Sequence, residues 1–153
     1  MASRRARIAT TVAIIIGALG LVTIQLSQFA VDATLRHWHE GASGLQTALD
    51  LQKTSHKPIA LFFHTDWCAN CKKLRENILS SEEFDQYLKN VIPVKINPET
   101  GLKERQLADN YGVFGYPTFL MIEPKLQTVT RIRTSQNLSP QQFVDQCKAA
   151  QQI

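Results

Sequence analysis

The longest apolar stretch of the chain runs from residue 8 to residue 31 and contains no charged side chain. As a helix it is long enough to span the hydrocarbon core of a bilayer, which is about 30 Å thick. Arg4, Arg5 and Arg7 stand just before it, and an excess of positive charge marks the side that stays in the cytoplasm. We therefore expect residues 1–31 to form a cytoplasmic basic tip and one transmembrane anchor. The remaining chain would then lie on the outer side of the cytoplasmic membrane.

A cleaved signal peptide is the second interpretation of this segment. Its basic start, its apolar centre and the small residue Ala33 suit a signal peptide, whereas the length of the apolar part and the polar residues Gln25 and Gln28 do not. Both interpretations export the part of the chain that follows. Residues 32–44 are then predicted to be a linker with a flexible end at Gly41–Gly44, before a folded domain of residues 45–153.

Within residues 45–153, short apolar runs alternate with segments of helical spacing. Strands are predicted at residues 58–63, 91–96, 118–122 and 128–133, and the last two form a hairpin. Helices are predicted at residues 45–53, 68–77, 80–89 (opening on a sequence that resembles a capping box), 102–111 (closed by Gly112) and from Ser139 onward. This order predicts an α/β domain, in which helices cover both faces of a central mixed sheet.

The charge of the chain narrows its possible partners. The formal net charge is +4, but three of the 17 basic residues belong to the N-terminal tip. The exported part therefore carries 14 basic against 13 acidic side chains. No stripe of basic residues with interleaved aromatic residues is present in the sequence, so we expect no nucleic acid among the partners.

The reactive chemistry of the sequence is concentrated in a Cys-x-x-Cys pair, Cys68 and Cys71, where a predicted strand gives way to a helix. A thiol at a helix N-terminus lies among unpaired backbone N–H groups, which favour the reactive thiolate. The second thiol lies one turn further along the same face, so the pair can close a short disulfide. Cys68 is the predicted nucleophile, and Cys71 is predicted to resolve its mixed disulfide with a substrate.

Two other uses of cysteine remain to be considered. Zinc would need four ligands at a recognisable spacing, and the sequence offers no second Cys-x-x-Cys, so we expect neither a metal nor an organic cofactor. Cys147 lies on the last predicted helix at apolar spacing with Phe143 and Val144. We expect it to be an inert buried thiol rather than a second redox centre.

The segment Asp66–Lys72, together with Tyr111–Thr118 later in the chain, resembles the thioredoxin superfamily. Within that superfamily, the sequence is most similar to the C-terminal periplasmic domains of the DsbD disulfide reductases, over roughly residues 45–150. The resemblance implies a thioredoxin fold in which Pro117 is cis and lies opposite the dithiol. It also implies that the backbone near Tyr116 pairs with an extended substrate segment. A trans proline that opens a strand is the alternative for Pro117.

Several residues beside the dithiol set its expected reactivity. Trp67 is expected to cover Cys68 and to offer substrates an apolar platform, although a core tryptophan would look the same in sequence. Phe62 replaces the buried aspartate that the family usually places six residues before the first cysteine, and Arg75 replaces an acidic residue of the DsbD relatives. Without these carboxylates we expect a more acidic Cys68. His64 shares a strand face with Phe62 and is a candidate for the missing proton relay; the alternative is a histidine that only packs at the strand end.

Together these features predict a membrane-anchored, extracytoplasmic thiol:disulfide oxidoreductase. The resemblance favours reduction of disulfides in exported proteins, with electrons from a membrane-embedded donor, because the outer compartment tends to keep exposed dithiols oxidised. Three alternatives stay open: a reductant for cytochrome c maturation, a disulfide oxidase or isomerase, and a binding module that keeps the fold without catalysis.

Overall fold

A computed structural model of the chain describes residue 35 and residues 37–125, 128–135 and 137–151. The chain divides into two compact units, residues 1–36 and 37–153, and the fold given below is that of the second unit. The predicted anchor or signal segment, residues 1–31, lies outside the described residues. In the described part, no helix is both long enough and apolar enough to cross a membrane.

The second unit is built on a mixed sheet of five strands in the order β1-β3-β2-β4-β5. Their bounds are β1 (His39–Glu40), β2 (Ile59–Phe63), β3 (Ile92–Ile96), β4 (Thr118–Ile122) and β5 (Val129–Ile132). β3 lies between β1 and β2 and is parallel to both, whereas β4 is antiparallel to β2 and to β5. The predicted mixed sheet and its terminal hairpin are confirmed.

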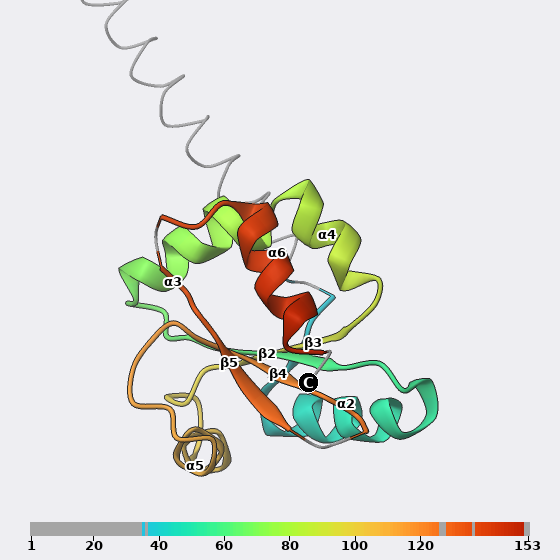
Figure 1. Cartoon of the computed structure of the whole chain (residues 1–153). Helices are drawn as coiled ribbons and strands as arrows, with labels where there is room; N and C mark the ends of the chain where they lie inside the picture. Colours follow the sequence, from blue (N-terminus) through green and yellow to red (C-terminus); the bar gives the residue numbers. More distant parts are fainter. Residues whose placement is uncertain (1–34, 36, 126–127, 136, 152–153) are drawn as a thin grey trace, which may run out of the picture. The chain divides into compact units, whose positions relative to one another are not determined.

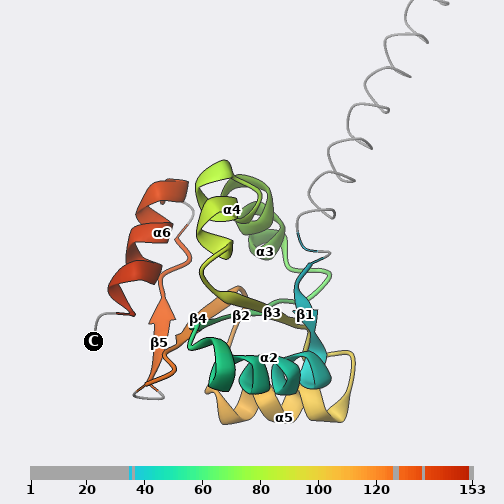
Figure 2. The same ribbon diagram turned by 90° about the vertical axis from the view of Figure 1, so that its right-hand side faces the viewer.

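Helices cover both faces of this sheet, as predicted (Figures 1 and 2). They are α2 (Gly41–Ser55), α3 (Ala69–Leu74) continued by a π-helical turn η1 (Arg75–Leu79), α4 (Glu82–Leu88), α5 (Leu102–Asn110) and α6 (Pro140–Ala149). α2 and α5 lie on one face, and α3, α4 and α6 lie on the other (Figure 2). The architecture is a thioredoxin fold, with a mixed sheet between two helical layers.

The helix ends follow the capping residues in the sequence. Ser139 forms a capping box with Gln142 at the start of α6, where Pro140 occupies the first turn. α4 begins at Glu82, two residues after the predicted start at residue 80, because its cap is Ser81, whose side chain accepts the Phe84 N–H at 3.2 Å. Gly112 ends α5 with a positive φ of 61°, a conformation that glycine adopts without a steric cost.

The prediction of a flexible linker end at residues 41–44 is wrong. The strand β1 already pairs with β3 at His39 and Glu40, and α2 begins at Gly41. Gly41 has a φ of 66°, which turns the chain from the strand into the helix. At Gly44 an added Cβ would lie 2.8 Å from the backbone carbon of His39, so the glycine allows the helix to approach the strand. These glycines serve a tight turn and close packing. A flexible linker is also rich in glycine, so the sequence pattern alone did not distinguish the two.

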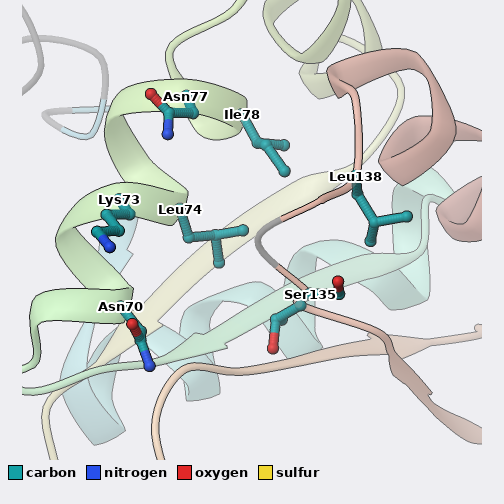
Figure 3. A pocket seen from close by; sticks show the side chains of 8 residues that line it. Asn70, Lys73, Leu74, Asn77, Ile78, Ser135 and Leu138 are labelled. Carbon is teal, nitrogen blue, oxygen red and sulfur yellow. The ribbon is translucent and has the colours of Figure 1, made fainter.

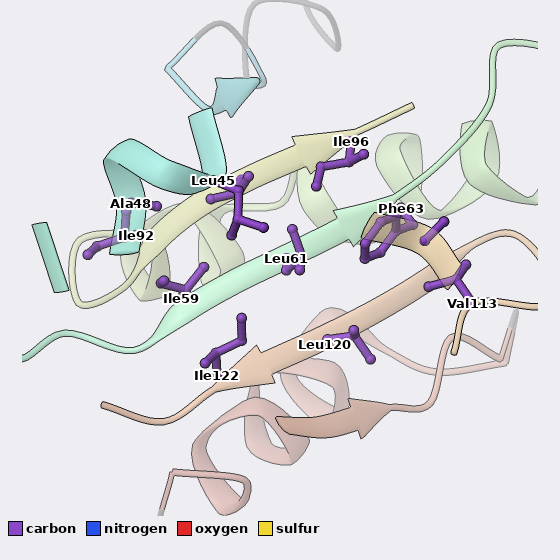
Figure 4. Close-up of a cluster of buried hydrophobic side chains, with 12 residues drawn as sticks. Leu45, Ala48, Ile59, Leu61, Phe63, Ile92, Ile96, Val113, Leu120 and Ile122 are labelled. Carbon is purple, nitrogen blue, oxygen red and sulfur yellow. The ribbon is translucent and has the colours of Figure 1, made fainter. Parts of the chain in front are cut away.

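Two clusters of buried side chains fill the two sides of the sheet. The aliphatic cluster lies beneath α2 and α5 (Figure 4) and consists of Leu45, Ala48, Ile59, Leu61, Phe63, Ile92, Val94, Ile96, Ala108, Val113, Leu120 and Ile122. The aromatic cluster lies on the other face and consists of Trp38, Phe62, Phe84, Phe119 and Phe143, with ring centroids of contacting pairs 5.0 to 6.5 Å apart. Both clusters hold the loops of the candidate site on rigid strands.

Candidate active site

The Cys68–Cys71 pair lies at the junction of β2 and α3, as the sequence predicted, and forms a disulfide. Cys68 is the residue that caps α3: its sulfur accepts the N–H of Cys71 at 3.0 Å. Cys71 is 1% exposed and Cys68 is 6% exposed, so an attacking thiol reaches the first cysteine more readily. A hydrogen bond from a backbone N–H stabilises a thiolate at this position when the pair is reduced.

Trp67 projects from the loop before Cys68 and is 70% exposed. Its indole Nε1–H donates to both carboxylate oxygens of Glu99, at 2.9 and 3.1 Å, and its ring meets Tyr116 edge to face at 6.3 Å. The side chain is therefore held by a polar anchor on one side and an aromatic neighbour on the other. The exposed Trp67 ring, fixed next to Cys68 in the chain, is consistent with the apolar platform that the sequence predicted.

The peptide bond between Tyr116 and Pro117 is cis, as the resemblance implied. The loop that carries this bond is tied to the end of the sheet by three side chains. Arg131 of β5 donates to the Thr118 Oγ1 and to the Gly112 carbonyl, both at 2.9 Å, and Thr118 donates to the Gly115 carbonyl at 2.8 Å. Thr134 donates to the Pro117 carbonyl at 3.3 Å. The loop is thus held at several points by β5 and the segment after it.

A groove of about 510 Å³ connects the dithiol helix with the cis-proline loop. It is lined by Asn70 from the active-site helix, by residues 114–118 of the loop, and by Arg131, Thr134 and Ser135. A hollow of about 250 Å³ continues it along α3, where Asn70, Lys73 and Leu74 lie across from Ser135 and Leu138 (Figure 3). The groove therefore lies between the first turn of α3 and the cis-proline loop.

The interior beneath the dithiol is aromatic where the family usually has a carboxylate. Phe62 is fully buried and stacks on His64, with ring centroids 5.2 Å apart. His64 is 9% exposed, and its Nε2 has no hydrogen-bond partner among the described residues. Burial, and then the nearby charges of Arg75 and Lys95, lower the pKa of His64 to about 4, so the ring is neutral at neutral pH.

The third cysteine lies apart from this site. Cys147 is fully buried on α6, and burial raises its pKa to about 12, which keeps the thiol protonated. The prediction of a buried cysteine is confirmed. Among the described residues, no three His, Cys, Asp or Glu side chains gather closely enough to hold a metal ion.

Sequence reasoning missed two residues that shape the site. Glu99 and Arg131 reach Trp67 and the cis-proline loop from segments 32 and 19 residues away in the chain. No periodicity or motif marks them, because each acts through hydrogen bonds to residues far away in the chain. Phe114, which is 99% exposed on the loop, was part of the motif that carried the resemblance, but it was not identified as a site residue.

Comparison with known proteins places these features in a family. Residues 45–151 match the family model described as "Thioredoxin-like domain". A curated relative, the "Disulfide bond reductase DsbH" of Chlamydia pneumoniae, is 33% identical over 95 residues, which are 56% of this chain and 57% of the relative. The "Thiol:disulfide interchange protein DsbD" of Campylobacter jejuni (strain RM1221) is 33% identical over 72 residues, 46% of this chain but 13% of that protein. The aligned part of the chain thus spans less than two thirds of these relatives.

A solved structure supports the same assignment. The structure titled "DsbH Oxidoreductase" superimposes with a TM-score of 0.64 at 28% identity, over 76% of this chain and 84% of that chain. The predicted similarity to thioredoxins and to DsbD is confirmed.

Proposed function

The chain belongs to the thioredoxin-like domain family, and we propose that it is a membrane-anchored thiol:disulfide oxidoreductase that reduces disulfides of exported proteins. The observation that supports this most directly is the position of Cys68. Its sulfur caps α3 and accepts a backbone N–H, and Asn70, two residues further on, lines the groove that the cis-proline loop bounds. The relatives named as a disulfide bond reductase and an interchange protein support the same kind of chemistry.

In the proposed reaction, the thiolate of reduced Cys68 attacks one sulfur of a substrate disulfide. A mixed disulfide forms and the other substrate sulfur leaves as a thiolate, which takes up a proton. The thiolate of Cys71 then attacks the Cys68 sulfur, closes the Cys68–Cys71 disulfide and releases the second substrate thiol. Two electrons and two protons pass from the dithiol to the substrate, and the oxidised pair corresponds to the disulfide described above.

The surrounding residues have supporting roles in this proposal. Trp67 provides the apolar platform, and the backbone at Tyr116 and Pro117 pairs with the extended substrate segment. His64 relays the proton that Cys71 gives up, through a neutral ring with one buried nitrogen that has no partner in the described part of the chain. If His64 only fills space, His64→Phe will leave the pH dependence of Cys71 reactivity unchanged.

Location and direction belong to the proposal as well. The apolar segment 8–31 would anchor the domain on the outer side of the cytoplasmic membrane, and a membrane-embedded donor would supply the electrons. A dithiol reduction potential of about −270 mV, like that of thioredoxin, would support a reductant, including one dedicated to cytochrome c maturation. A potential of about −120 mV would support a disulfide oxidase instead.

The decisive experiment compares insulin reduction by the wild type and by Cys68→Ser. We expect the variant to lose the catalysed rate entirely, because the nucleophile is absent. Cys147→Ala is the matched control, since it removes a buried thiol outside the site and is expected to retain the rate. Equal rates for the wild type and Cys68→Ser would instead indicate a binding module that uses the fold without catalysis.

The natural substrate can be sought with a second variant. Cys71→Ser lacks the resolving thiol, so its mixed disulfide with a client is expected to persist and can be identified by mass spectrometry. Loss of the adduct in the Cys68→Ser/Cys71→Ser double variant would assign the trapped bond to Cys68.

A further inference from the structure

The two sides of the dithiol differ in charge. On the side of the Trp67 platform there are two carboxylates. Asp66 precedes Cys68 by two residues, and Glu99 accepts the hydrogen bond from the Trp67 indole. On the groove side, the charged residues among those described that line the groove and its continuations are Lys73, Arg131 and Arg133. An acidic side chain of a substrate would therefore meet opposite charge on the groove side.

Arg131 is the best placed of these basic residues to contact a substrate. It lines both the 510 Å³ groove and an adjoining hollow of about 350 Å³ along β5. Its two terminal nitrogens are held at 2.9 Å by Thr118 and Gly112, so the guanidinium is already ordered before a ligand binds. A guanidinium has five N–H donors, and the bonds to the described residues use two, which leaves donors for a carboxylate.

An apolar contact lies next to this cation. Phe114 lines the same groove and is 99% exposed, so its ring is open to an apolar side chain of a bound segment. Its loop is anchored by Arg131 and Thr134, so the ring projects from a fixed backbone. The groove thus offers one ordered cation and one aromatic surface to a single extended segment.

We propose that this groove selects substrate cysteines that have an acidic residue and an apolar residue close by in an extended segment, with Arg131 binding the acid and Phe114 the apolar side chain. The proposal rests on the proposed function, because the segment is held there while its disulfide reacts with Cys68. Arg131 acts as a specificity residue and takes no part in the sulfur chemistry.

The test uses three peptides that differ only at one position near a single cysteine, which carries Glu, Gln or Lys. Each cysteine is present as a mixed disulfide with thionitrobenzoate, a good leaving group whose release is followed by absorbance. The full-length chain is first reduced with dithiothreitol and freed of it. Attack by Cys68 releases thionitrobenzoate and leaves the peptide on the enzyme, so the flanking residue lies in the groove during the measured step.

We expect the wild type to react with the Glu peptide about tenfold faster than with the Lys peptide, because each exposed charge pair contributes a few-fold change at most. Arg131→Glu should invert this preference, and Arg131→Lys, which keeps the charge but loses the fork of donors, should retain its direction. Lys125→Glu makes the same change of sign in the exposed turn between β4 and β5 and should leave the ratio unchanged. High salt should reduce the preference.

Each ratio is taken within one variant, so a general loss of reactivity or of folded protein cancels. Equal rates for the three peptides with the wild type, or an unchanged preference in Arg131→Glu, would overturn the charge selection. Failure of the wild type to react even with the Gln peptide would contradict the proposed function itself.

Discussion

The two faces of the sheet are formed by the same strands but differ in the side chains that are buried on them. Leu61 and Phe62 are neighbours on β2, and both are fully buried. Leu61 lies in the aliphatic cluster, which has no charged member, whereas Phe62 lies among aromatic rings that end at His64. On the Phe62 side, Lys95 of β3 forms an ion pair with Glu40 at 3.3 Å.

This difference indicates that the two buried clusters contribute differently to stability and to the chemistry of the site. The aliphatic cluster contributes stability alone, because it contains no group that titrates near neutral pH. The aromatic face contributes stability and also surrounds a buried histidine beneath the dithiol helix, where packing sets the pKa. Changes on the two faces are therefore expected to have similar effects on folding and different effects on thiol chemistry.

The largest expected effect comes from a pair of truncations that tests this comparison. Leu61→Ala should lower the free energy of unfolding by about 2–5 kcal/mol, and Phe62→Ala by about 3–5 kcal/mol, as measured by urea denaturation. Only Phe62→Ala should also raise the pKa of His64 toward 6.5, because water can enter the space that the ring leaves. A rise in the pKa of His64 in the Leu61→Ala variant, read from its resonance as the pH is changed, would contradict the separation of the two faces.

A second prediction concerns acid stability. The pKa of His64 is about 4 in the folded protein and 6.5 at its ordinary value, so the unfolded chain binds more protons between these pH values. Stability from the neutral ring is fully present above about pH 6.5 and is lost as the pH falls through about 4, to a total of about 3 kcal/mol. His64→Phe should remove this part of the acid dependence, as followed by circular dichroism with urea at several pH values.

His56 provides the matched control for that measurement. It is exposed and adopts a left-handed conformation with φ of 54°, which asparagine also tolerates. His56→Asn should leave the acid dependence as in the wild type. An equal change in the two variants would show that the burial of His64 is not its cause.

The smallest expected effects come from two carboxylates, Glu99 in the turn after β3 and Glu104 in the first turn of α5. Glu99→Ala removes the hydrogen bond to Trp67 and should lower kcat/KM for insulin a few-fold and shift the Trp67 fluorescence, with little change in stability. Glu104 accepts the Ala42 N–H at the start of α2, and this bond lowers its pKa. Glu104→Ala should reduce stability slightly and leave the rate unchanged. A rate loss in Glu104→Ala equal to that in Glu99→Ala would argue against a specific role for the Trp67 anchor.

Much of the candidate site was visible in the sequence because it depends on neighbours in the chain. Cys68 and Cys71 are one helical turn apart, and Tyr116 directly precedes Pro117, so short motifs locate them. Ser139 and Pro140 similarly predicted the start of α6, and the structure adds a capping box that Ser139 forms with Gln142 in the same turn. The strands followed from apolar runs of the expected length.

What the sequence established is the order of the strands and helices from α2 onward, the dithiol at a helix N-terminus and the family resemblance, because periodicity, capping and short motifs are local properties. Only the tertiary structure showed that Gly41 and Gly44 serve a turn and a close approach, that Glu99 anchors Trp67, and that Arg131 holds the cis-proline loop. These features depend on which distant segments meet when the sheet assembles. Hydrophobic burial drives that assembly, and the polar residues that it brings together carry no pattern in the nearby sequence that would predict their contacts.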